Sequence, residues 1–234
     1  MPRGHGDAEF RRNRMHSGRD SGVHATRGAG GVFEENQIYA NERAGVAIES
    51  GASPLLRRNK IFDGKQCGVF FFENGLGSMW ENEVWGNLEA GVQIIEESDP
   101  LLQGNTIRCQ ARRDADDRPV ETPSLWIHLD GRGKLQGNEV CDAGANAVVV
   151  GVGAQPQLEA NTIRGARKAG VLVQDGGAPT LLDNEICSCH VGIECIDDGD
   201  PLARGNRIHS HTMGSLWVHK DGRGTIEDNE LYAN

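Results

Sequence analysis

The stretch AGVAIESGASPLLRRNKIFDGKQCGVFFFENGLGSMWENEVWGN, residues 44–87, contains one unit twice. Each unit opens with Gly-Val and an alternating apolar run, passes through a turn, and reaches an Asn that is followed two residues later by an apolar side chain. Alternation with a period of two residues is typical of a β-strand with one buried face. Asn59 and Asn82 mark the two units, which predict short strands joined by tight turns.

This Asn spacing extends over the whole chain. Successive Asn residues lie 23 residues apart, except for one interval of 33 and one of 22. The ten positions are Asn13, Asn36, Asn59, Asn82, Asn105, Asn138, Asn161, Asn184, Asn206 and Asn229. A coil of this length cannot bury an apolar face alone, whereas stacked coils pair strand on strand. The spacing predicts an all-β, single-stranded parallel β-helix of about ten coils, with Asn amides hydrogen-bonded from coil to coil.

We expect residues 1–234 to form a single β-helix domain with one interrupted coil. The interval of 33 residues places about ten extra residues in a surface loop insertion at 109–123. The loop carries the charged residues Arg112, Arg113, Asp114, Asp116, Asp117 and Arg118. This composition favours a solvated insertion, and a binding loop is the alternative.

Charge and composition limit the possible partners and the location. The formal net charge of −10 argues against binding to nucleic acid or to an anionic membrane, because both attract basic surfaces. No apolar run approaches the roughly 18 residues of a membrane helix. The first residues contain no apolar segment of the kind found in secretory signals. We therefore expect a cytoplasmic or nuclear protein whose six cysteines are reduced, without nucleic-acid or membrane partners.

The outward side of the Gly-Val strand carries large apolar residues where polar ones are usual. Val46 and Ile48 fall on the inner face, and Ala47 and Glu49 on the outer one. The predicted partner-binding face consists of Phe70, Phe72, Gln93, Ile95, Trp126, His128, Leu172, Trp217 and His219. Exposed aromatic clusters are typical of binding hot spots. Burial of this face under another part of a longer protein is the alternative.

Two nearly identical segments bear on catalysis. SLWIHLDGRG begins at Ser124 and SLWVHKDGRG at Ser215, and both fall on the same strand of different coils. Four coils separate the two segments by roughly 19 Å. A general base must lie within hydrogen-bond reach of the proton it takes, so the two segments do not form one active site. The sequence therefore assigns no catalytic residue, and a protein without enzymatic activity is favoured.

Two groups of residues resemble cation sites, and the sequence favours neither a metal nor a cofactor. The first group is Cys187, Cys189, His190 and Cys195, whose spacing is not common for zinc. The second group consists of the acidic turns with Glu96, Glu97 and Asp99, and with Asp197, Asp198 and Asp200. The glycine-and-aspartate nonapeptide of calcium-binding β-rolls is absent, which favours a solvated acidic edge.

The motif P-x-L-x-x-N-x-I with Gly-Val strands resembles the right-handed β-helix repeats of the F-box-only ubiquitin-ligase adaptors. Related repeats occur in carbohydrate-binding and sugar-hydrolase domains. The resemblance implies a right-handed solenoid that recognises a protein partner, such as a ubiquitin-ligase substrate, for protein ubiquitination. The chain differs from those adaptors because no F-box-like helical segment precedes the repeats. Polysaccharide lyases, hydrolases and epimerases share the architecture, so a carbohydrate-binding or polysaccharide-processing protein is the alternative.

The first and last repeats also carry a prediction. An uncapped β-helix end exposes unpaired strand edges, and such edges pair readily with other chains. We therefore expect end-to-end self-association, a capping partner, or continuation in a longer chain.

Overall fold

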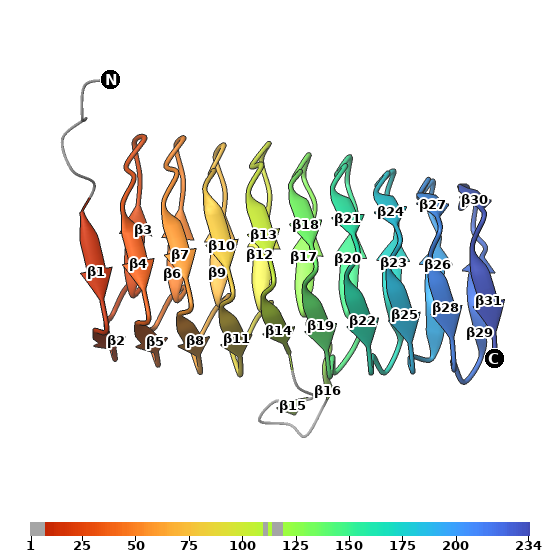
Figure 1. Ribbon diagram of the computed structural model, residues 1–234, viewed down its shortest axis with the longest axis horizontal. Helices are drawn as coiled ribbons and strands as arrows, with labels where there is room; N and C mark the ends of the chain where they lie inside the picture. The colour runs from red at the N-terminus through yellow and green to blue at the C-terminus, as the bar shows by residue number, and fades with distance from the viewer. Residues whose placement is uncertain (1–7, 110–111, 114–118) are drawn as a thin grey trace.

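The computed structural model describes residues 8–109, 112–113 and 119–234, which form one stack of short parallel strands. Figure 1 shows the coils side by side along the long axis, with the first coil at one end and the last at the other. Sheets A and B have ten strands each and sheet C has nine, so nine coils are complete and a tenth has two strands. The described ranges contain no helix, and hence none long and apolar enough to cross a membrane. The predicted parallel β-helix is confirmed.

Each sheet takes one strand from every coil. Sheet A comprises β1 (Glu9–Arg11), β4 (Val32–Glu34), β7 (Leu55–Arg57), β10 (Ser78–Trp80), β13 (Leu101–Gln103), β18 (Lys134–Gln136), β21 (Gln157–Glu159), β24 (Thr180–Leu182), β27 (Leu202–Arg204) and β30 (Thr225–Glu227). Sheet B comprises β2 (Arg14–His16), β5 (Gln37–Tyr39), β8 (Lys60–Phe62), β11 (Glu83–Trp85), β14 (Thr106–Arg108), β19 (Glu139–Cys141), β22 (Thr162–Arg164), β25 (Glu185–Cys187), β28 (Arg207–His209) and β31 (Glu230–Tyr232). Sheet C comprises β3 (Val23–Ala25), β6 (Val46–Ile48), β9 (Val69–Phe71), β12 (Val92–Ile94), β17 (Leu125–Ile127), β20 (Val148–Val150), β23 (Ala169–Val173), β26 (Val191–Cys195) and β29 (Gly214–Val218).

The regularly spaced Asn residues form a ladder between sheets A and B. In Asn138, the backbone N–H and the side-chain Nδ2 donate to Oδ1 of Asn161 over 2.9 and 3.0 Å. The same Nδ2 donates to the backbone oxygen of Leu102 over 2.9 Å. This pattern repeats in neighbouring coils and satisfies the polar groups of a buried corner, as the sequence predicted.

Apolar columns fill the interior of the stack. Leu158, three residues before a ladder Asn, and Ile163, two residues after it, are 1% and 0% exposed. The glycine that opens many sheet C strands lies too close to the next coil for a side chain. A Cβ atom on Gly45 would approach the backbone oxygen of Gly68 to 2.6 Å and Cγ2 of Ile61 to 2.5 Å. The Gly-Val pattern therefore marks close packing between coils.

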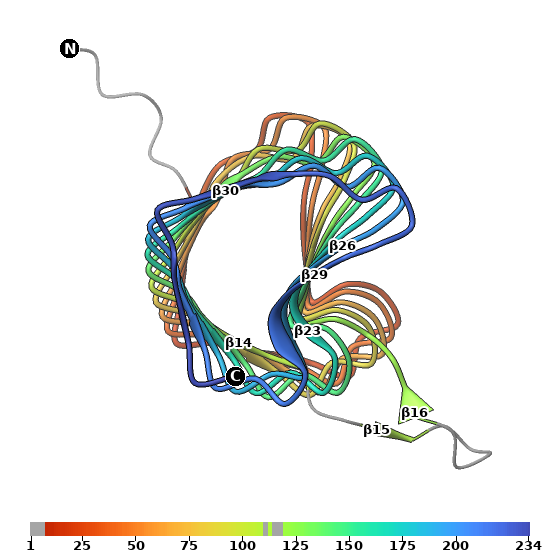
Figure 2. The same ribbon diagram turned by 90° about the vertical axis from the view of Figure 1, so that its right-hand side faces the viewer.

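The coil is not round. In the view along the stack, the chain turns inward at sheet C, between two connections that bulge outward (Figure 2). The insertion leaves the stack beside this indented side as a hairpin of β15 (Arg112–Arg113) and β16 (Pro119–Val120), which pair in antiparallel. Three of the predicted loop residues, Asp116, Asp117 and Arg118, lie outside the described residues, as does Asp114.

The base of the insertion is tied to the coil. The backbone N–H of Cys109 donates to Oγ of Ser124 over 3.0 Å, and the Cys109 thiol lies 3.1 Å from Oγ1 of Thr122. Near the end of the insertion, Glu121 accepts a hydrogen bond from Nζ of Lys168 over 2.6 Å. The polypeptide thus re-enters sheet C at a fixed point.

Deletion of ten residues, 111–120, should leave the fold intact. The deletion restores the 23-residue interval between Asn105 and Asn138, and a change in loop length alters the free energy of unfolding by less than about 1 kcal/mol. Chemical denaturation of the two proteins measures this difference. A loss of several kcal/mol would show that the insertion packs against the stack.

Candidate binding face on sheet C

The outward residues of sheet C follow the predicted register. Gln93 is paired with Phe70 on one side and with Trp126 on the other, so these three side chains lie on adjacent coils. The segments at Ser124 and Ser215 enter strands of the same sheet, β17 and β29, which β20, β23 and β26 separate. Their likeness therefore reflects the repeat, as the sequence predicted.

Three aromatic pairs lie on this face, each formed by residues two positions apart. Phe70 stacks on Phe72 with ring centroids 4.6 Å apart. Trp126 stacks on His128 at 4.2 Å, and Trp217 on His219 at 4.1 Å. Trp126 and Trp217 are 37% and 40% exposed, so both are partly open to solvent although a His ring stacks on each. The sequence placed these residues on one face but gave no sign that they stack in pairs.

Hydrogen bonds fix the first Trp–His pair. Nε2 of Gln93 lies 2.9 Å from Nε2 of His128, and the thiol of Cys67 donates to Oε1 of Gln93 over 2.9 Å. Because the amide nitrogen can only donate, Nε2 of His128 accepts and its Nδ1 carries the proton. Burial lowers the pKa of His128, which keeps the imidazole neutral at neutral pH.

The second Trp–His pair has a charged partner. Nε2 of His219 lies 3.0 Å from Oε1 of Glu194, which belongs to the preceding coil. The carboxylate orients the imidazole against Trp217. A similar contact of 3.2 Å joins His24 and Glu49 at the other end of the sheet.

The outward side chains between Trp126 and Trp217 project little from the sheet. Val149 is 8% exposed and Leu172 is half-buried. Ile95, which lies between Phe72 and His128, is also 8% exposed. Gly151 follows the strand after Val149, at the position that His128 takes in the preceding coil. The aromatic residues of the predicted partner-binding face therefore lie in two groups, with Phe70, Phe72, Trp126 and His128 in one and Trp217 and His219 in the other.

The sheet C face carries no lysine or arginine. Its outward positions within the strands are His24, Ala47, Phe70, Gln93, Trp126, Val149, Leu172, Glu194 and Trp217, and all of them are described. The positions just beyond the strands are Thr26, Glu49, Phe72, Ile95, His128, Gly151, Gln174, Ile196 and His219. The ionisable groups on this face are thus carboxylates and histidines. The predicted loop residues Arg112 and Arg113 lie on the β15 backbone, beside this face.

A hollow on the outer side of sheet A was not expected from the sequence. It has a volume of about 510 Å³ and includes Trp80, Gln103 and Gln136 in its lining. Gly104 and Gly137 stand where most other coils carry a side chain just before the ladder Asn, which opens the space. Its two cationic residues, Arg57 and Arg58, both donate to the buried carboxylate of Glu34.

The cysteine group whose residue types would suit zinc, Cys187, Cys189, His190 and Cys195, is not arranged as a metal site among the described residues. Cys195 faces the core and is 1% exposed, and burial raises its pKa to about 12. Burial likewise raises the pKa of Cys189 to about 11. Exposed His190 contacts Oγ1 of Thr212 at 2.8 Å. Within the described residues, no group of three or more Cys, His, Asp or Glu is placed to hold a metal ion.

Sequence comparison identifies one family. The model described as the right-handed beta helix region matches residues 3–113 and 125–234. No curated protein matches the sequence.

Several solved structures share the fold. A double mutant of the periplasmic alginate epimerase AlgG is 10% identical over 89% of this chain, with a TM-score of 0.71. The A-module of the Azotobacter vinelandii mannuronan C-5 epimerase AlgE6 is 14% identical over 92% of this chain, with a TM-score of 0.70. The A-module of AlgE4 from the same organism is 15% identical over 94% of this chain, with a TM-score of 0.63.

These likenesses show the fold alone, because the identities are low. The chain spans 62%, 64% and 58% of the lengths of the three structures. None of the comparisons supports the resemblance to F-box-only adaptors or a role in ubiquitination. The polysaccharide epimerases fit the carbohydrate alternative better than the protein-recognition interpretation that the sequence favoured.

Proposed function

Because the chain belongs to the right-handed β-helix family, we propose that its sheet C face binds an extended carbohydrate chain. The observation that carries the proposal is the pair of exposed Trp–His stacks, Trp126 with His128 and Trp217 with His219, on one side of the solenoid. Four coil spacings of about 4.8 Å separate the two Trp residues by roughly 19 Å along the axis. A chain of several linked sugars can contact both.

The chemistry of the stacks suits sugars. The face of a sugar ring that presents C–H groups loses contact with water when it lies on an indole ring, and this burial is favourable. Each imidazole backs one face of its indole and holds it in place. Gln93, Gln174 and Glu194 lie on the same face and supply hydrogen-bonding groups for hydroxyls. The outward side chains of the coils between the two Trp residues, such as Val149, are largely buried, which leaves room for the sugar chain there.

The charge of the face favours a neutral carbohydrate. The similar structures are epimerases of alginate or mannuronan, a name that denotes a chain of uronic acids. On this face a uronate carboxylate would meet Glu49 and Glu194 and no lysine or arginine. The formal net charge of −10 adds further repulsion. The proposal therefore assigns binding of a neutral chain and gives no residue a role in bond cleavage or epimerisation.

Protein recognition by the same face is the second candidate. The observation that favours it is the neighbouring Phe70–Phe72 and Trp126–His128 stacks, which have the composition of a protein-binding hot spot. A sugar chain would compete with a protein for the same indole faces, and this competition can be measured.

A panel of neutral and acidic oligosaccharides tests the proposed function. We expect binding to neutral chains, with an affinity that rises with chain length until the ligand spans from Trp126 to Trp217, because longer chains reach the second stack. Isothermal titration with a length series of the best ligand measures this dependence. Binding to uronic acid chains alone, or an affinity independent of length, would contradict the proposal.

A further inference from the structure

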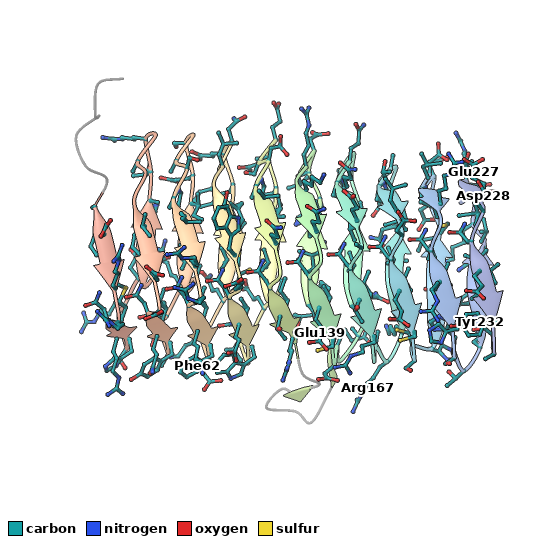
Figure 3. The ribbon with its side chains drawn as sticks, in the orientation of Figure 1. Phe62, Glu139, Arg167, Glu227, Asp228 and Tyr232 are labelled. Atoms are coloured by element: carbon teal, nitrogen blue, oxygen red, sulfur yellow. The ribbon has the colours of Figure 1, made fainter. Side chains whose placement is uncertain are left out.

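The two ends of the stack carry opposite charges. In the first coil, Arg11 on β1, Arg12 between the strands and Arg14 on β2 are exposed. In the last coil, Glu227 on β30, Asp228 between the strands and Glu230 on β31 are exposed. Figure 3 shows Glu227 and Asp228 on the terminal coil, and Tyr232 further along the same coil. The outermost strand edges therefore attract each other when the first coil of one molecule approaches the last coil of another.

Both ends also expose apolar residues of the core columns. Phe10 in β1 is 39% exposed and Leu231 in β31 is 46% exposed, whereas Leu158 and Ile163 in central coils are almost fully buried. Met15 in β2 and Ile226 in β30 are partly buried. A further coil on either end would remove this apolar surface from water.

A single register pairs the arginines of the first coil with the acidic residues of the last coil and also aligns their ladder Asn, apolar and aromatic residues. Aligning β1 with β30 and β2 with β31 by the repeat places Arg11 beside Glu227, Arg12 beside Asp228, Asn13 beside Asn229, Arg14 beside Glu230, Met15 beside Leu231, and His16 beside Tyr232. This alignment uses the parallel pairing found between all other coils. It joins three cations to three anions and continues the core columns.

The same contacts already occur inside the chain. Oε1 of Glu34 lies 2.6 Å from Arg57 of the next coil, and its Oε2 lies 3.3 Å from Arg11 of the preceding one. Among the described residues, Glu227 and Glu230 contact an arginine only in the preceding coil, where Arg204 lies at 4.0 Å from Glu227 and Arg207 at 3.5 Å from Glu230. An incoming first coil would place Arg11 and Arg14 on their open side.

Aromatic rings stacked on the outside of sheet B also end with an open ring face at each end of the stack. His209 stacks on Tyr232 at 4.6 Å, which leaves the other face of the Tyr232 ring at the end of the stack. His16 stacks on Tyr39 at 4.7 Å, and its outer face is also at an end. Stacking of His16 on Tyr232 would join these two columns.

The Asn ladder has complementary ends. Each ladder Asn gives its backbone N–H to the Oδ1 of the next Asn, as Asn206 does to Asn229 over 2.8 Å. Among the described residues, the backbone N–H of Asn229 has no acceptor and Oδ1 of Asn13 has no donor. The register that pairs the charges brings this donor to this acceptor.

We propose that the last coil of this chain binds the first coil of a second copy, head to tail, through sheets A and B. Sheet C takes no part because its last strand, β29, belongs to the ninth coil. The contact joins two different surfaces, so it does not close on itself and continues along the axis as a linear assembly. This inference is independent of the proposed carbohydrate binding.

Charge reversal at one end at a time tests the proposal. One variant carries Arg12→Glu and Arg14→Glu, and the other carries Asp228→Arg and Glu230→Arg. Sedimentation of the wild-type protein from about 1 μM to about 1 mM should show a mass that rises steadily with concentration. Each variant alone should associate at least about tenfold more weakly than the wild-type protein, because two attractive contacts become repulsive. An equimolar mixture should regain the association, since each variant then meets an end of opposite charge.

The mixture keeps the test valid if a variant loses stability. A variant that failed to fold would not be rescued by mixing, and circular dichroism checks its fold directly. The matched control for the first variant is Arg132→Glu with Arg167→Glu, which makes the same change in net charge as Arg12→Glu with Arg14→Glu at exposed positions in the middle of the stack and should associate like the wild-type protein. A wild-type monomer at all concentrations, a closed dimer, or a mixture that associates no better than the single variants would overturn the proposal.

Discussion

Replacement of Ile163 with aspartate is expected to unfold the protein under conditions in which the wild-type protein is folded. Ile163 is fully buried on β22, and its partners in the adjacent coils are Val140 and Ile186. The new carboxylate would have no counter-charge and no water among these apolar side chains. The cost is about 4 kcal/mol or more, which is comparable with the whole stability of many domains.

Chemical denaturation and circular dichroism measure this effect. The matched control is Gln157→Asp on β21 of the same coil, whose side chain points outward and lies beside Lys134. The control should change the free energy of unfolding by less than about 1 kcal/mol. Equal stability of the two variants would show that the column of Ile163 is not the core.

The substitution Asn138→Ala should have the second-largest effect. It leaves the backbone N–H and Nδ2 of Asn105 without their acceptor, and it removes the donor to Leu102. A buried polar group without a partner costs about 1–3 kcal/mol, so the free energy of unfolding should fall by about 3–5 kcal/mol. The measurement is a denaturation curve at constant temperature.

The end of the ladder supplies the control for this prediction. Asn13 is exposed and donates only to Asn36, so Asn13→Ala should cost about 1 kcal/mol or less. Similar losses for Asn13→Ala and Asn138→Ala would mean that the ladder adds little beyond the strands themselves.

The fold could be predicted from the sequence because each coil repeats the same pattern of ladder Asn and inward apolar residues. Asn59 and Asn82 fix the period, and the apolar residues three before and two after each Asn fix the inward faces. The strand register then follows, since a slip of one residue would expose every core column. Even the placement of Trp126 and Trp217 on one sheet depends only on the period.

The details of the face could not be predicted in this way. His128 and His219 lie just beyond their strands, where the backbone leaves the regular pleat, and their rings turn back onto the Trp residues. Ile95 is covered although its position in the repeat is outward. The hollow beside Trp80 arises from the absence of side chains at Gly104 and Gly137, which no apolar pattern reveals.

The central claim is that carbohydrate binds to the sheet C face, and a comparison of two Trp residues tests it most directly. Trp126 lies on this face, whereas Trp80 lines the hollow on sheet A. With the best neutral oligosaccharide as ligand, Trp126→Ala should weaken binding by about 1–3 kcal/mol, roughly 5- to 150-fold in Kd, while Trp80→Ala leaves it within about twofold. Melting curves of both proteins establish that each remains folded. Normal binding by Trp126→Ala together with a large loss in Trp80→Ala would contradict the account and place the carbohydrate on sheet A.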